Sequence, residues 1–210
     1  MTRLVTVAHG TRAPEGNAVA RALTGAAGTR LGMPWVASYV ELASPLFASV
    51  MASGVPSVVV PLLLSAGHHV RHDIGSGRPL GPDPLLAVAQ VARLVAAGAS
   101  PGSPVVMVAA GSRDPLATRD QMLAAAYLSE QWRGPVRLAT LSGVGRRPVD
   151  VVTPHDVVSP YLLAPGHFAD RCRAESSAAA VVADVIGAHS AVVDLVVSRA
   201  VEELAGRRSA

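Results

Sequence analysis

The stretch VVVPLLLSAGHHVRHDI, residues 58–74, decides the fold of this chain. It begins as a dense apolar run, passes through small residues and then presents His68, His69 and His72. A continuous apolar run that ends in turn residues is typical of a strand buried on both faces, as in a parallel sheet. The stretch therefore predicts a buried strand with histidines just beyond its carboxyl end.

The same pattern returns about 100 residues later, where VVSPYLLAPGHF (157–168) echoes VVVPLLLSAGHH (58–69). Two further pairs keep the order and the offset: VAHGTRAP (7–14) with VAAGSRDP (108–115), and residues 79–98 with 185–206. Self-similarity at a fixed offset indicates a duplicated structural unit. We therefore predict an amino-terminal α/β unit, 1–100, that carries the site, and a degenerate repeat, 104–206, after the linker GASPGSP at 98–104.

Strand patterns and helix patterns alternate within each copy, which predicts parallel β-α-β units. The first copy has strand patterns at RLVTVA (3–8), WVASYVE (35–41) and SVVVPLLL (57–64). Helix starts are indicated by a capping side chain followed by proline at Ser44-Pro45, Asp83-Pro84 and Asp114-Pro115. Because β-α-β crossovers are nearly always right-handed, the economical architecture is two small doubly wound parallel sheets.

The composition excludes several classes of protein. Half of the 210 residues are hydrophobic but only 3% are aromatic, so the core is built mainly from Ala, Val and Leu. Every basic residue is Arg, which removes a P-loop lysine, a Schiff base and a pyridoxal attachment. The methionines Met33, Met51, Met107 and Met122 are interpreted as core or helix filler.

Localisation and partners follow from the same features. The net charge of +3 is spread along the chain without interleaved aromatics, so no nucleic-acid partner is expected. No apolar stretch reaches the roughly 18–20 residues of a membrane span, and the start lacks a signal-peptide pattern. A lone cysteine, Cys172, fits a reducing compartment. We expect a cytoplasmic protein without a membrane partner.

Polar residues collect where the predicted strands of the first copy end. His9 ends the first strand, Glu41 the second, and His68 and His69 follow the third. Open α/β sheets bind ligands beyond the carboxyl ends of their strands, so these side chains are expected at one rim. Gly10 and Gly67 would let the backbone turn sharply there.

The second copy serves as an internal control for these residues. Aligning the echoes places His9 opposite Ala110, His69 opposite Phe168 and His68 opposite His167. The second copy therefore retains the scaffold without two of the histidines. The fold does not demand His9 or His69, which makes them candidates for function.

Two imidazoles and one carboxylate suit a divalent metal and leave coordination positions open. Imidazole is also a base near neutral pH. No HExxH, cysteine cluster or GxSxG motif is present, so a protease or serine hydrolase lacks support.

The chain resembles the class II sirohydrochlorin chelatases, which comprise the cobalt chelatases of anaerobic cobalamin synthesis and the ferrochelatases of siroheme synthesis. VAHGTR, VELASP and VPLLLSAGHHVRHDI carry the resemblance, and YLLAPGHFADR extends it into the second copy. It implies two α/β units that face a central cleft, and the ATP-independent insertion of Fe²⁺ or Co²⁺, or of Ni²⁺, into sirohydrochlorin without a nucleotide. It also implies that His9 and His69 bind the metal and accept pyrrole protons while Glu41 assists.

The substrate of that family carries acetate and propionate groups, which arginine binds through charge-assisted hydrogen bonds. Arg12, Arg71 and Arg78, with His68, are the candidate substrate contacts, although a structural salt bridge is an equally good interpretation of Arg12. The segment 75–81 is short, so the fourth strand of the first unit is expected to be reduced or missing. A second chain could fill that gap, which makes a homodimer an expectation.

Two alternatives stay open at this point. One is a non-catalytic carrier of metal or tetrapyrrole on the same fold. The other is a doubly wound protein that binds a sugar or a nucleotide, which predicts no metal affinity and no dependence on His9. Between iron and cobalt we favour iron, because siroheme serves widespread sulfite and nitrite reduction.

Overall fold

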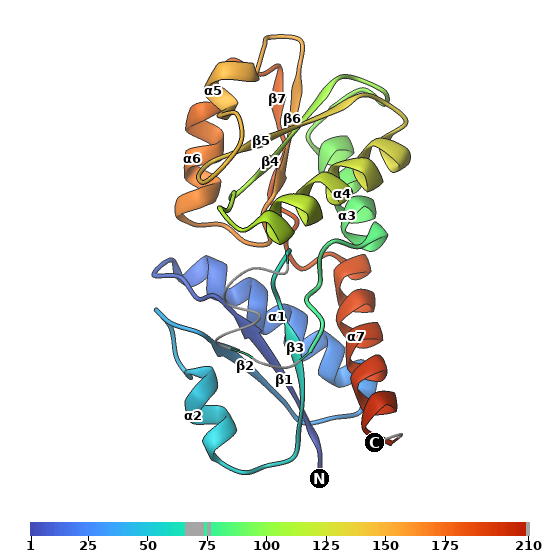
Figure 1. Cartoon of the computed structure of the whole chain (residues 1–210). Helices are drawn as coiled ribbons and strands as arrows, with labels where there is room; N and C mark the ends of the chain where they lie inside the picture. Colours follow the sequence, from blue (N-terminus) through green and yellow to red (C-terminus); the bar gives the residue numbers. More distant parts are fainter. Residues whose placement is uncertain (66–73, 75–76, 209–210) are drawn as a thin grey trace. The chain divides into compact units, whose positions relative to one another are not determined.

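The computed structural model describes residues 1–65, 74 and 77–208. It divides into two compact units, unit 1 (Met1–Leu80 with Ala188–Ala210) and unit 2 (Gly81–Gly187). Each unit contains a parallel sheet flanked by helices, as Figure 1 shows. The predicted fold class, two α/β units with parallel sheets, is confirmed.

Unit 1 has the strand order β2-β1-β3 among its described residues. The strands are β1 (Arg3–Ala8), β2 (Trp35–Tyr39) and β3 (Ser57–Pro61), and the helices are α1 (Pro14–Leu31), α2 (Phe47–Ala52) and α7 (Ser190–Arg208). β1 spans the predicted residues, whereas β2 and β3 end earlier than their apolar patterns. One face of the sheet packs Val5, Val7 and Val59 against Phe47, Val50 and Ile74.

Unit 2 repeats this arrangement and adds a short strand, in the order β5-β4-β6-β7. Its strands are β4 (Val105–Ala109), β5 (Val136–Thr140), β6 (Val157–Tyr161) and β7 (Val181–Val182), and its helices are α3 (Pro84–Ala96), α4 (Pro115–Trp132), α5 (Pro148–Val151) and α6 (His167–Glu175). Within the described residues, β7 has no counterpart in unit 1, in line with the reduced fourth strand inferred from the short segment 75–81. Over the same part of the chain, no helix is both long and apolar enough to cross a membrane.

The compact units differ from the predicted units 1–100 and 104–206, because the two copies exchange their last helices. α3 follows the strands of unit 1 in sequence but packs on α4 and β6 of unit 2. α7 ends the second copy but packs on α1 and β3 of unit 1. These are the helices of the third sequence echo, so each occupies an equivalent place on the other sheet.

Buried polar contacts fix which helix belongs to which sheet. Gln90 of α3 donates from Nε2 to Ser159 Oγ of β6 over 2.8 Å inside unit 2. Arg199 of α7 is buried in unit 1 and donates to the carbonyl oxygens of Pro79 (3.1 Å) and Leu80 (3.4 Å). A misplaced helix would leave these groups unsatisfied, which costs more than the bond itself contributes.

Two of the three predicted helix starts are confirmed. Asp83 and Asp114 accept hydrogen bonds from the backbone N–H groups two residues on, at 3.0 and 2.9 Å, with proline at the first helical position. The prediction at Ser44-Pro45 is wrong, because α2 begins only at Phe47 and has no side-chain cap. The Pro45 carbonyl instead accepts the Tyr39 N–H at 3.1 Å, which keeps this segment extended beside β2.

The Gln90–Ser159 contact gives a test of the helix exchange. We expect Ser159→Ala to lower the free energy of unfolding by about 1–3 kcal/mol, because the buried Gln90 amide loses its partner. Adding Gln90→Leu should recover much of the loss, since no buried donor then remains. Urea unfolding of the two variants, with the exposed Ser198→Ala as control, measures this, and additive losses in the double variant would contradict it.

Candidate functional site

The rim of unit 1 is defined by the carboxyl ends of β1 and β2. These strands pair in register up to Ala8 and Tyr39, so the residues that follow them leave the sheet side by side. The Glu41 N–H donates to the His9 carbonyl over 3.1 Å. His9 Nε2 lies 3.5 Å from Glu41 Oε1. The structure therefore brings together two of the three residues predicted to be catalytic.

The His9–Glu41 pair is open to solvent, with 43% of the His9 side chain and 55% of the Glu41 side chain exposed. A half-exposed imidazole can bind a metal ion from solution or take up a proton. A carboxylate at this distance can orient the imidazole or hold the ion pair that forms when the ring is protonated. The chemistry available here is metal ligation coupled to proton transfer.

Gly10 is what allows His9 and Glu41 to approach. Its φ is +96°, and a Cβ atom built on it would lie 1.9 Å from the Glu41 carbonyl oxygen. Any side chain at this position would push the end of β2 away from the end of β1. The sharp turn predicted at Gly10 is confirmed, whereas Gly67 lies outside the described residues.

A side chain at Gly10 would lower stability in two ways, through its positive φ and through steric contact with Glu41. A matched pair of variants measures the two contributions separately. Gly32 also has a positive φ, +62°, but a Cβ there would meet nothing within 4 Å. We expect Gly32→Ala to cost about 1–2 kcal/mol of unfolding free energy from the left-handed backbone alone. Gly10→Ala should cost clearly more, because the Glu41 backbone must also move, and equal losses in chemical denaturation would contradict the close approach.

The other predicted site residues fall in three places. Arg12 is exposed beyond β1 and forms no ion pair within the described part of the chain, so the structural salt bridge considered for it is not seen there. Arg78 Nη1 lies 3.8 Å from Glu202 Oε2 of α7. His68, His69 and Arg71 lie outside the described residues. Their placement at the rim stays a prediction.

The described residues by themselves do not complete a metal centre. Within residues 1–65, 74 and 77–208, no group of three or more His, Cys, Asp or Glu side chains gathers at one point. A metal site at this rim therefore needs a ligand besides His9 and Glu41. His69 is the predicted one.

The rim of unit 2 repeats the backbone of unit 1 without its ligands. Ala110 and Ser142 take the places of His9 and Glu41, and Ser142 Oγ donates to the Ala110 carbonyl over 2.7 Å. Gly111 has a φ of +88°, and a Cβ on it would lie 1.8 Å from the Ser142 carbonyl oxygen. The same close turn thus exists in both units, with imidazole and carboxylate only in the first.

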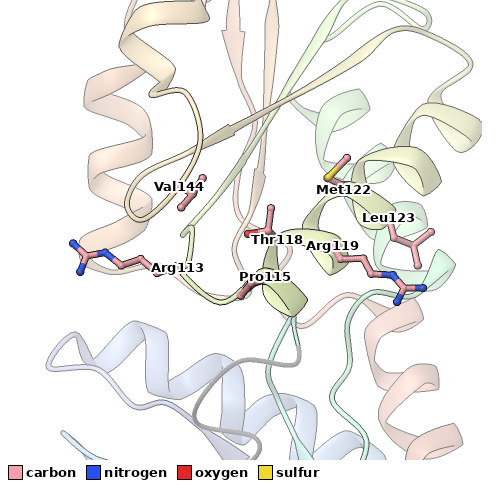
Figure 2. Close-up of a pocket in the computed structure, with 7 residues that line it drawn as sticks. All are labelled: Arg113, Pro115, Thr118, Arg119, Met122, Leu123 and Val144. Carbon is pink, nitrogen blue, oxygen red and sulfur yellow. The ribbon is translucent and has the colours of Figure 1, made fainter.

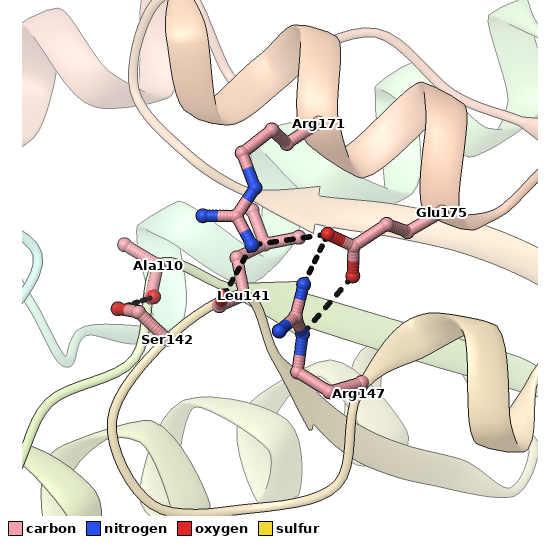
Figure 3. A network of polar contacts seen from close by, with 6 residues as sticks. All are labelled: Ala110, Leu141, Ser142, Arg147, Arg171 and Glu175. Atoms are coloured by element: carbon pink, nitrogen blue, oxygen red, sulfur yellow. Dashed lines mark hydrogen bonds and ion pairs between the residues drawn. The ribbon is translucent and has the colours of Figure 1, made fainter.

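The loop after β5, residues 141–147, is held to α6 by an arginine–carboxylate network (Figure 3). Arg171 Nη2 donates to the Leu141 carbonyl at 2.8 Å and to Glu175 Oε1 at 3.0 Å. Arg147 donates to the same carboxylate through Nε and Nη2, and its Nε lies 3.1 Å from Glu175 Oε2. Burial alone raises the pKa of Glu175, but the hydrogen bonds from both arginines outweigh it and leave this pKa below its usual value.

The lowered pKa of Glu175 makes this network sensitive to acid. A depressed carboxyl pKa stabilises the folded state above the unfolded pKa of about 4.5 and ceases to do so as the pH falls through the folded value. We expect Glu175→Gln to destabilise the protein at pH 7 and to differ less from the wild type as the pH drops below 4.5. Urea unfolding at a series of pH values checks this, and a gap independent of pH would contradict it.

Sequence reasoning missed a pocket on unit 2 (Figure 2). It has a volume of about 630 Å³ and is lined by Arg113, Pro115, Thr118, Arg119, Met122, Leu123 and Val144. Met122, interpreted from sequence as filler, is 63% exposed, whereas Met107 is fully buried. The available signal was the spacing of residues 115, 118, 119, 122 and 123, which places them on one face of a helix.

A known family model matches the amino-terminal segment of the chain. Residues 3–77 match the CbiX family model. This CbiX segment contains His9, Glu41 and His69, and therefore all three residues predicted to be catalytic or metal-binding. No curated protein matches the chain.

Solved structures extend the likeness of fold beyond the CbiX segment. SirB from Bacillus subtilis with Fe³⁺ is 24% identical, with a TM-score of 0.79 over 99% of this chain and 97% of that one. CbiX, described as the terminal enzyme of siroheme biosynthesis in denitrifying bacteria, is 16% identical, with a TM-score of 0.66 over 95% and 98% of the two chains.

A third solved structure is DR2241 from Deinococcus radiodurans, a multi-domain protein with structural similarity to chelatases. It is 20% identical, with a TM-score of 0.72 over 97% of this chain but 55% of that one. The chelatase-like fold predicted from the sequence is confirmed, and so is the resemblance to the chelatase family.

Proposed function

We propose that this protein inserts a divalent metal ion, Fe²⁺ or Co²⁺, into sirohydrochlorin without ATP, as a lyase of siroheme or cobalamin biosynthesis in the cytoplasm. The observation that carries the proposal is the His9–Glu41 pair, 3.5 Å apart at an open rim within the CbiX segment. The chelatase-like fold over nearly the whole chain supports it.

The chemistry of metallation explains why these side chains are suited to the task. Insertion requires that the ion lose water ligands and that two pyrrole N–H groups lose their protons. His9, with His69, would hold the ion as a substrate, since neutral imidazole binds Fe²⁺, Co²⁺ and Ni²⁺ alike. Imidazole has a proton affinity suited to removing protons near neutral pH, and Glu41 would orient His9 or receive its proton.

The open geometry fits a metal that is delivered rather than retained. His9 and Glu41 are about half exposed, so an ion held here keeps exchangeable water ligands. A permanent structural site would instead enclose its ion with four protein ligands. The choice between iron and cobalt follows from supply and ring affinity as much as from the ligands.

The absorbance change of sirohydrochlorin on metallation tests the proposal directly. We expect the purified protein to raise the insertion rate with Fe²⁺ or Co²⁺ above the spontaneous rate. His9→Ala and His69→Ala should lower that rate by about 10²-fold or more, and Glu41→Gln by about tenfold, in keeping with the usual contribution of an acid–base group.

His155→Ala is the matched control, because His155 is an exposed imidazole of unit 2 just before the amino end of β6. It should keep the wild-type rate. A protein that binds metal or sirohydrochlorin without raising the rate is a carrier, and the catalytic proposal is then wrong. Undiminished insertion by His9→Ala would also overturn the assignment of the site.

A further inference from the structure

Leu42, the residue after Glu41, has a backbone conformation that leucine rarely adopts. Its φ is +63°, and the Ala43 N–H donates across it to the Glu41 carbonyl at 2.8 Å, which closes a γ-turn. The form of this turn with a positive central φ is rare and strained. In the described part of the chain the other non-glycine residue with a positive φ is Arg133, which ends α4, a place where such a φ is common.

Burial does not offset the strain at Leu42. The residue is 50% exposed, so its side chain gains little of the stabilisation that a buried leucine supplies. Glycine would adopt the same conformation without a steric cost. Unit 2 has glycine at the equivalent position, Gly143, whose φ is +73°. The backbone of the rim therefore does not require a leucine.

A strained residue that the fold does not require indicates a use for its side chain. We propose that Leu42 is a specificity-determining residue of the metal rim, whose side chain contacts the apolar face of the ring while His9 and Glu41 act on the ion and the protons. This inference rests on the proposed function for the identity of the ring, sirohydrochlorin. All three residues belong to unit 1, so the inference needs no residue of unit 2.

The position of Leu42 next to Glu41 brings it within reach of the ring. To accept a pyrrole proton, His9 must come within hydrogen-bond distance of a ring nitrogen, and Glu41 Oε1 lies 3.5 Å from His9 Nε2. The macrocycle extends well beyond its central nitrogens and so over the residues beside this pair. Both polar backbone groups of Glu41 are bonded, the N–H to the His9 carbonyl and the carbonyl to the Ala43 N–H. Leu42 is therefore held in place before a ligand arrives, which avoids the entropy cost of ordering a loop.

The chemistry of leucine favours contact with the ring over contact with the ion. A leucine side chain offers no ligand atom to a metal ion and no hydrogen bond to the water that the ion carries. The face of a conjugated ring, in contrast, is apolar, and covering it with leucine removes apolar surface of both groups from water. Loss of the Leu42 side chain should thus weaken binding of the ring and spare binding of the metal.

The test compares titrations of the full-length, metal-free protein with sirohydrochlorin, followed by the absorbance of the ring, and with Co²⁺. We expect Leu42→Gly to raise the dissociation constant for the ring about tenfold, because the apolar contact of one leucine is lost, and to leave that for Co²⁺ unchanged. Insertion kinetics should show the same split, with a higher KM for the ring and a kcat close to that of the wild type. Leu42→Met keeps an apolar side chain of similar volume and should bind the ring within about twofold of the wild type.

Arg133→Gly is the matched control, because it also places glycine where another residue has a positive φ, but in unit 2. It should bind the ring and Co²⁺ as the wild type does. Both glycine variants should melt close to the wild-type temperature, since relief of the positive φ offsets the added freedom of the unfolded chain. If Leu42 has only a structural role, Leu42→Gly will instead melt lower and lose affinity for Co²⁺ as well as for the ring, and that result would overturn the inference.

The outcomes separate this inference from the proposed function. If the wild type inserts metal and Leu42→Gly binds sirohydrochlorin as tightly as Arg133→Gly does, the inference is wrong and the proposed function stands. If the wild type binds the ring without inserting metal, and Leu42→Gly weakens that binding about tenfold, the proposed function fails and Leu42 is upheld as a contact of the ring. If the wild type does not bind the ring, both are wrong.

Discussion

The in-register pairing of β1 with β2 is the constraint on which the candidate site depends. Because Ala8 pairs with Tyr39, the chain leaves both strands at one level, and the His9 carbonyl accepts the Glu41 N–H at 3.1 Å. A shift of one residue would turn one of the two side chains to the other face of the sheet. The backbone, rather than any attraction between imidazole and carboxylate, therefore sets their distance. That is consistent with a separation of 3.5 Å, longer than a strong hydrogen bond.

The same close turn occurs in unit 2. It distinguishes the residues that form the backbone of the rim from the side chains that provide its chemistry. Gly111 and Ser142 reproduce the tight backbone approach of Gly10 and Glu41, so the turn belongs to the fold. The imidazole and the carboxylate occur at one rim only, so they are not needed to form it. A duplicated unit that has kept its backbone but not its ligands can acquire another task.

Much of the fold, and the proximity of His9 to Glu41, could be predicted because the deciding signals are local. Val58 to Val60 specify a buried strand by themselves, and the aspartate caps of α3 and α4 act within two residues of each helix start. The position of the rim could be predicted from the residues at which the apolar strand patterns end. His68 and His69 could be named in the same way, but their geometry depends on residues that the structure does not describe.

The failures share a physical cause, which is that a sequence pattern reveals an apolar face but not its partner. α3 and α7 carry the same echo and fit equivalent places on two similar sheets, so only remote contacts such as Gln90–Ser159 decide the exchange. Met122 follows a helical spacing typical of a core, yet no element covers it within the described part of unit 2. Ser44-Pro45 matches the pattern of a helix start, but the Pro45 carbonyl accepts the Tyr39 N–H of the neighbouring strand.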